Sequence, residues 1–299
     1  MKSIRKQWFA ASCLLAMAAP AGIAAERVEP IALNRPFDLR VIESGHSLTD
    51  PIPAMLEGMV RAAGGPAVTV ARSTVPGSPM DWRWNNPPEY GPDARAVIGD
   101  YQVLVLTERV SLSGTMPWHG SSAEALRWFN HAWENGDGGK GAETILYASW
   151  IDLRSGPDFD NPYNDPEGHV PFRQRLELEL ARWEEIAASV NANRRKDAPE
   201  MRMIPGPVIM AAAYDDIAAG KAPGLTDMAA LFADDIHVND LGAYLISLAH
   251  YAVIYGRDPR GLPASIGQQT PPEPATAAWM QDLVWRVVTN YPGSGIAPQ

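Results

Sequence analysis

The sequence contains a single cysteine, Cys13, in 299 residues. One cysteine excludes an intrachain disulfide, a cysteine-based zinc site and an iron–sulfur cluster. Positive charge is also scarce, because 25 Lys and Arg face 35 Asp and Glu for a formal net charge of −10. Nucleic acids and anionic membranes attract basic surfaces, so neither is expected as a partner. No glycine-rich phosphate loop or dinucleotide fingerprint is present, and no cofactor is expected.

The composition is otherwise that of a folded globular protein. Hydrophobic residues make up 46% of the chain and charged residues 20%, which excludes a disordered chain, a coiled coil and collagen. The length allows one large domain or two small ones.

The first 24 residues have the three zones of an export signal. Basic residues come first, at Lys2, Arg5 and Lys6. The apolar run 8–19 is too short to span a bilayer, which needs about 20 residues. Small residues at Gly22 and Ala24 suit a cleavage site. We therefore expect a signal peptide at 1–24 and a periplasmic or secreted protein, without a stable membrane anchor after cleavage.

Two other interpretations of this segment remain. One is an uncleaved membrane anchor. The other is a lipoprotein signal at Cys13, although residues 9–12 lack the usual aliphatic residue before the cysteine. Cleavage near Ala24 removes Cys13, so the mature chain has no thiol, and a cysteine nucleophile is excluded.

Short apolar runs alternate with patterns of helical spacing along the rest of the chain. Strands are expected at residues 37–43, 67–71, 101–107, 144–150 and 201–204. Helices are expected near 52–60, from 122, at 172–190, from 207, at 241–252 and at 277–290. This alternation predicts an α/β fold, with a parallel sheet of about five strands covered by helices on both faces. We expect a single domain over 25–299, with its core at about 37–262 and a C-terminal helical extension at about 277–290.

Ser47 lies where the first expected strand ends and the first helix begins. In an open α/β sheet, ligands bind beyond the carboxyl ends of the strands. A serine at that place lies beside helix N-terminal N–H groups, which stabilise a developing oxyanion. The alternative is a serine that simply caps the helix.

Asp234 and His237 are three residues apart in a segment that immediately precedes an amphipathic helix. A nucleophilic serine needs a base within hydrogen-bond reach, and the base needs a carboxylate that fixes its tautomer. An Asp-x-x-His segment supplies both groups. The alternative is a solvated aspartate and a histidine without a partner.

Together, the two segments resemble the first and last blocks of the SGNH (GDSL-type) hydrolase family. They read Gly45-His46-Ser47 and Asp234-x-x-His237 here. The resemblance implies a flavodoxin-like three-layer α/β/α sandwich, with Ser47 as nucleophile, His237 as base and Asp234 as its orienting carboxylate. The family's second block supplies an oxyanion-hole glycine, and its place after the second strand makes Gly77 the candidate, beside the N–H of Ser47.

The chain departs from the family pattern in two blocks. His46 replaces the usual aspartate of the first block. The third block, typically G-x-N-D, reads Leu106-Thr107-Glu108-Arg109 and has no asparagine to donate to the oxyanion. An ionised Glu108 would repel an oxyanion, so we expect it to point away, to be protonated or to be paired, for instance with Arg109. The hydroxyl of Thr107 is the candidate replacement donor.

Three of the ten tryptophans, Trp82, Trp84 and Trp118, follow the second and third strands. Aromatic faces stack on sugar rings, which makes these residues candidates for substrate binding, while packing within the loops is the alternative. Acidic residues crowd 158–167, but their spacing matches no calcium loop, so a solvated turn is favoured and no metal site is assigned.

These observations favour an exported serine esterase that hydrolyses carboxylic esters, including O-acyl groups on carbohydrates, through a Ser-His-Asp acyl-enzyme mechanism. Its partner would be a small-molecule or glycan ester. One alternative is a catalytically silent SGNH-like domain that binds glycans or another envelope component. Another is an O-acyltransferase with the same triad, since only the second nucleophile differs.

Overall fold

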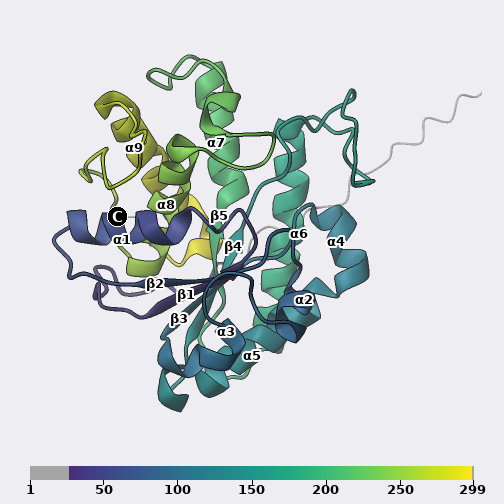
Figure 1. The fold of residues 1–299 in the computed structure, drawn as a ribbon, viewed down its shortest axis with the longest axis vertical. Coiled ribbons are helices and arrows are strands. Elements are labelled where there is room, and N and C mark those ends of the chain that lie inside the picture. Colours follow the sequence, from purple (N-terminus) through teal and green to yellow (C-terminus); the bar gives the residue numbers. More distant parts are fainter. Residues whose placement is uncertain (1–26, 298–299) are drawn as a thin grey trace, which may run out of the picture.

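The computed structural model describes residues 27–297, so the signal peptide expected at 1–24 lies outside it. Five strands form one parallel sheet in the order β2-β1-β3-β4-β5. Their bounds are β1 Val41–Gly45, β2 Val70–Thr74, β3 Val103–Leu106, β4 Glu143–Ala148 and β5 Arg202–Pro205. The predicted α/β class and five-stranded parallel sheet are confirmed. Figure 1 shows the sheet between two groups of helices, as in a three-layer α/β/α sandwich.

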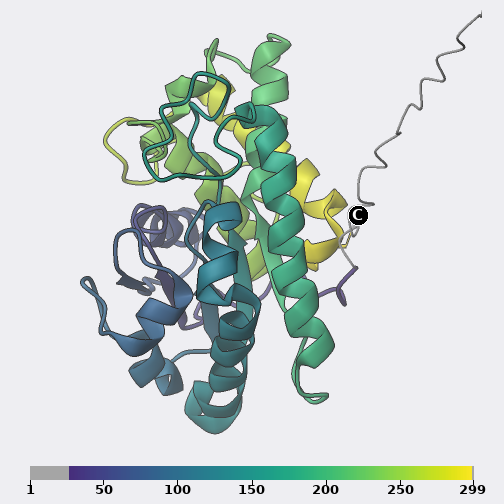
Figure 2. The same ribbon diagram turned by 90° about the vertical axis from the view of Figure 1, so that its right-hand side faces the viewer.

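Helices cover both faces of this sheet, and each group packs around its own hydrophobic core. One group contains α1 Ile52–Ala62, α7 Gly206–Ala218, α8 Asp240–Tyr255 and α9 Pro274–Asn290. The other contains α2 Met80–Asn85, α3 Ala94–Val97, α4 Leu112–His119, α5 Ser121–Gly139 and the long α6 Phe172–Asn193, which is prominent in Figure 2. Short 3₁₀ turns occupy Ile98–Asp100, Met228–Leu231 and Pro292–Ser294.

Helix α8 is the centre of the first layer. It is apolar on nearly all sides, and it is buried from Gly242 to Tyr255 because α1 and α9 pack against it. The expected C-terminal extension lies in this same core, where Leu283 and Val284 of α9 are 0% exposed. No helix of residues 27–297 has both the length and the apolar character needed to cross a bilayer.

The structure differs from the sequence expectations mainly at element ends. Strand β1 begins at Val41 rather than residue 37, because its pairing with Val70 and Val103 begins there. Helices α2, α3 and α4 were not predicted. All three are eight residues or shorter, and α4 contains Pro117, so their sequences lack sustained periodicity.

Candidate active site

Ser47 lies in the tight turn that joins β1 to α1. The N–H of Thr49 donates to the carbonyl of His46 (2.8 Å), and the N–H of Asp50 donates to that of Ser47 (3.3 Å). A side chain at Gly45 would place its Cβ 2.0 Å from Oγ1 of Thr49, so the turn requires glycine there. The turn therefore fixes Ser47 at the carboxyl end of β1, which lies between β2 and β3 in the sheet.

Asp234 and His237 lie in the loop before α8, and this loop is held by its own backbone. Oδ1 of Asp234 accepts hydrogen bonds from the N–H groups of Ile236 (2.9 Å) and His237 (2.7 Å). The side chain of Asn239 then caps α8 by accepting from Leu241 and Gly242. The three-residue spacing therefore places Asp234 and His237 at the two ends of one turn, where the carboxylate of Asp234 can orient the side chain of His237.

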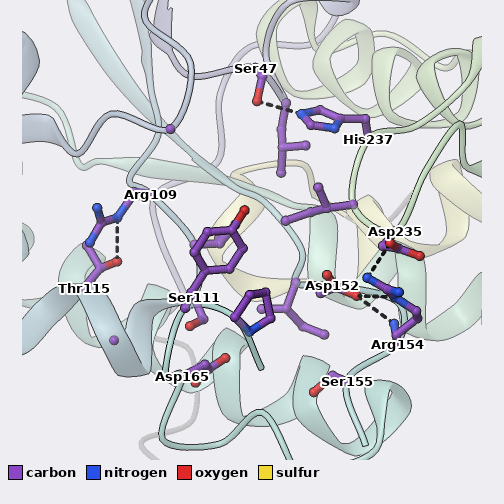
Figure 3. Close-up of a pocket in the computed structure, with 18 of the residues that line it drawn as sticks. Ser47, Arg109, Ser111, Thr115, Asp152, Arg154, Ser155, Asp165, Asp235 and His237 are labelled. Atoms are coloured by element: carbon purple, nitrogen blue, oxygen red, sulfur yellow. Dashed lines mark hydrogen bonds and ion pairs between the residues drawn. The ribbon is translucent and has the colours of Figure 1, made fainter. Parts of the chain in front are cut away.

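The structure brings Ser47, His237 and Asp234 into one hydrogen-bonded chain, and Figure 3 shows its Ser47–His237 contact. Nε2 of His237 lies 2.8 Å from Oγ of Ser47, and its Nδ1 lies 2.8 Å from Oδ2 of Asp234. Although burial acts to raise the pKa of Asp234, the two backbone N–H groups and the imidazole lower it overall. An ionised Asp234 holds the proton on Nδ1, which leaves Nε2 free to accept the proton of Ser47.

The serine and the histidine open on a cavity of about 820 Å³. Its wall comes from the ends of β1 and β3, from α4, from the segment between β4 and α6, and from the loop before α8. A cavity of this size suits a small-molecule or sugar-sized ligand. Its position beyond the carboxyl ends of the strands is where α/β folds bind ligands.

Gly77 lines the same cavity, and Thr107 does not. Gly77 has a positive φ of 64°, and neither its N–H nor that of Ser47 finds a hydrogen-bond acceptor among residues 27–297. Thr107 is buried, with its N–H on the carbonyl of Ser44 (3.2 Å) and its hydroxyl directed to the carbonyl of Glu108 (3.4 Å). The structure thus brings two of the three predicted oxyanion donors to the cavity.

Glu108 points away from the cavity, in agreement with the first of the three alternatives. Its Oε1 accepts from the N–H groups of Met80 (2.9 Å) and Arg109 (2.7 Å), and the side chain is fully buried. Burial raises the pKa of Glu108, although the charge of Arg83 opposes this shift. No ion pair forms between Glu108 and the guanidinium of Arg109 within the described residues.

His46, at the position of the family's aspartate, joins the first and third strand ends. Burial, followed by the charge of Arg83, lowers the pKa of His46 to about 3. The ring is therefore neutral at physiological pH, and its Nε2 donates to the carbonyl of Glu108 (3.0 Å) while Nδ1 faces the N–H of Leu48 (3.4 Å). His46 is thus a buried link between the end of β1, which Ser47 follows, and the end of β3.

None of the three candidate tryptophans lines the cavity. Trp84 packs edge-on against Trp128, with ring centroids 5.1 Å apart, and Arg127 covers its face. Trp82 and Trp118 are 42% and 83% exposed. Their helices, α2 and α4, are joined where Nδ1 of His119 contacts Asp81 (3.0 Å), so the two indoles belong to adjoining surface elements.

Sequence reasoning missed several residues of the cavity wall. Arg109, Ser111 and Thr115 follow β3, and a strand end is a signal that would have suggested them. Arg154 and Tyr163 come from the segment between β4 and α6, where no pattern marks them.

The acidic run 158–167 is held by arginines. The buried Arg175 of α6 pairs with Asp165 (2.8 Å) and Glu167 (3.1 Å), and Arg182 also pairs with Glu167. Within the described part of the chain, no three His, Cys, Asp or Glu side chains gather in a way that could hold a metal ion. These carboxylates therefore anchor the cavity wall to α6.

Comparison with known proteins finds similarity in structure but not in sequence. No family model matches the chain. No curated protein matches it in sequence. A solved DUF4886 family protein from Bacteroides uniformis ATCC 8492 is 12% identical, with a TM-score of 0.63 over 84% of this chain and 95% of that one.

Two further solved structures are less similar. A proposed SGNH hydrolase from Slackia heliotrinireducens is 18% identical, with a TM-score of 0.47 over 71% of this chain and 97% of that one. The acetyl xylan esterase AlAXEase is 13% identical, with a TM-score of 0.46 over 72% of this chain and all of that one. The three-layer fold implied by the resemblance is confirmed by the parallel sheet and the helices on both of its faces, and the DUF4886 family protein is similar to this chain in fold.

Proposed function

We propose that this chain is an exported serine esterase that hydrolyses carboxylic esters, O-acyl groups on carbohydrates among them. The observation that carries the proposal is the hydrogen-bonded chain Asp234–His237–Ser47 at the wall of a sugar-sized cavity. Nucleophilic catalysis requires this relation of serine, base and orienting carboxylate. Export rests on the residue pattern of 1–24.

The geometry supports an acyl-enzyme mechanism. Oγ of Ser47 attacks the ester carbonyl carbon while Nε2 of His237 takes the hydroxyl proton, and Asp234 stabilises the imidazolium. The N–H groups of Ser47 and Gly77 receive the negative oxygen of the tetrahedral intermediate. The C–O bond to the alcohol then breaks, and His237 returns its proton to the leaving alcohol. Water repeats the sequence on the acyl-serine and releases the acid.

The carbohydrate part of the proposal rests on two exposed indoles. Trp82 and Trp118 lie on adjoining helices outside the cavity, and neither is packed into a core. Aromatic faces on that surface offer stacking area to sugar units beyond the one whose ester is cleaved.

The experiment is covalent labelling of the purified protein with a fluorophosphonate, beside the variants Ser47→Ala and His237→Ala. We expect labelling of the wild type, none in Ser47→Ala, and a loss of at least about 10³-fold in rate in His237→Ala. Circular dichroism and thermal unfolding show whether each variant is folded. A folded wild type that is not labelled contradicts the proposal and favours a silent domain, to be tested with glycan-binding assays.

A further inference from the structure

The charges that line the cavity leave one guanidinium without a carboxylate partner. Four aspartates lie in the wall, and each contacts a cationic or titratable partner: Asp152 and Asp235 contact Arg154, Asp165 contacts Arg175, and Asp234 contacts His237. Arg109 lines the same cavity, and no carboxylate of residues 27–297 lies within ion-pair distance of it. Figure 3 shows Arg109 across the cavity from the Arg154 cluster.

Neutral groups hold Arg109 in a fixed orientation. Its Nε donates to Oγ1 of Thr115 (3.3 Å), and its Nη2 lies 3.2 Å from Nε2 of His119. A guanidinium only donates, so Nε2 of His119 accepts, and Nδ1 of that ring carries the proton that is shared with Asp81 (3.0 Å). Asp81 and His119 therefore act as positioning residues for Arg109.

These contacts occupy one edge of the Arg109 guanidinium and leave its opposite edge free. Nε and Nη2 form the occupied edge. The opposite edge, formed by Nη1 and the second N–H of Nη2, has no acceptor in the described structure. Two parallel N–H groups match the two oxygens of a carboxylate, which binds such an edge with two charge-assisted hydrogen bonds.

We propose that Arg109 is a specificity-determining residue that binds a carboxylate carried by the ester substrate. The inference rests on the proposed esterase function and narrows it to acidic esters. In a chain with a net charge of −10, a local cation is needed to attract such a substrate, because the overall field repels it. For the carbohydrate esters proposed above, the matching class is an O-acylated acidic sugar.

The experiment compares esters that differ only in a carboxylate. The first pair, 4-acetoxybenzoate and its methyl ester, carries the charge on the alcohol side. The second pair, monomethyl and dimethyl adipate, carries it on the acyl side. The measured quantity is the ratio of kcat/KM for the acid to kcat/KM for its methyl ester. We expect the wild type to prefer the acid of one pair, which also identifies the side.

The variants are Arg109→Gln and Arg109→Lys, with Arg195→Gln as the matched control. Arg195 is an exposed residue after α6 that does not line the cavity, and its loss changes the net charge by the same unit. We expect Arg109→Gln to lower the ratio by about tenfold to hundredfold, since hydrogen bonds to charged groups are of that strength. The ratio for Arg109→Lys should lie between those of the wild type and Arg109→Gln. Arg195→Gln should keep the wild-type ratio.

Two outcomes overturn the inference: no preference in the wild type, or an unchanged ratio in Arg109→Gln, whether both esters of a pair keep their kcat/KM or lose it equally. An equal loss on both esters would assign Arg109 to the oxyanion instead. If the folded wild type hydrolyses no ester and is not labelled by fluorophosphonate, the proposed function fails. Binding then decides the inference separately: calorimetry with Ser47→Ala should show the acid of one of the two pairs binding more tightly than its methyl ester, and this difference should vanish in Ser47→Ala/Arg109→Gln.

Discussion

At the scale of single residues, the site depends on which nitrogen of each histidine carries a proton. Asp234 holds the proton of His237 on Nδ1, so the unprotonated Nε2 faces the hydroxyl of Ser47. His46, only one position from the serine, has a pKa of about 3 because it is buried, and it stays a neutral hydrogen-bond donor. Two histidines in the same cavity wall thus have opposite roles, and their surroundings decide which one can take a proton.

The backbone at Gly77 gives a test of the oxyanion site at this scale. Gly77→Ala has open space for its Cβ, but a φ of 64° is strained for alanine, so the N–H should turn away from the cavity. We expect kcat/KM for a short acyl ester to fall by up to about 10²–10³-fold, which is the loss caused by removing an oxyanion donor. Gly220→Ala is the matched control, with a φ of 67° and equally open space after α7. Equal activity in the two variants would exclude Gly77 from the site.

The predictability of the site also differs from residue to residue. Ser47 and the Asp234–His237 pair could be selected because each stands at a strand–helix or loop–helix junction with a recognisable spacing. The orientation of Glu108 could not be predicted, because it depends on the N–H of Met80, which belongs to a six-residue helix without periodicity. Tyr163 reaches the cavity wall only through a fold-back of its loop that no local pattern encodes.

At the scale of elements, the segment between β4 and α6 forms one wall of the cavity, and ion pairs attach this segment to α6. Arg175 has no exposed side-chain surface, and it contacts Asp165, Glu167 and Oγ of Ser113 in α4. One arginine therefore ties together α6, α4 and the loop that carries Tyr163. Tyr163 itself is 87% exposed, so this anchor rather than apolar packing holds the loop.

We expect Arg175→Met to destabilise the protein by about 1–3 kcal/mol, because it leaves the partly buried Asp165 without its cation. Urea unfolding measures this loss, and limited proteolysis should cut within 156–170 sooner than in the wild type. Arg173→Met on the same helix is the control. Its pairs with Asp215 and Glu177 lie near the surface, where such pairs contribute about 0–1 kcal/mol. Similar losses in both variants would refute the anchoring role.

At the scale of the whole molecule, one layer is built around α8, and α9 completes it. The expected strands and long helices were predictable because their apolar periodicity is a local property. The place of α9 was not, because a helix with one apolar stripe gives no information about which element it packs against. Its contact with α8 and its buried Met280, Leu283 and Val284 show that it closes the core.

Leu283→Ala tests whether α9 supports the rest of the fold. We expect a loss of about 2–5 kcal/mol in the free energy of unfolding, the usual result of emptying a buried leucine site. Leu178→Ala on α6, where the leucine is 40% exposed, should change it by less than about 0.5 kcal/mol. Urea denaturation of both variants measures the difference. A loss in Leu283→Ala no larger than in Leu178→Ala would mean that α9 is dispensable.

The hydrogen bond between Ser47 and His237 joins residues 190 positions apart in the chain. A ribosome that adds about 5–20 residues per second needs about 10–40 s to make the intervening segment. During that time the nascent polypeptide contains the serine without its base. The proposed nucleophile therefore lacks its histidine throughout that time, and the two side chains meet only when the last third of the chain has emerged and folded.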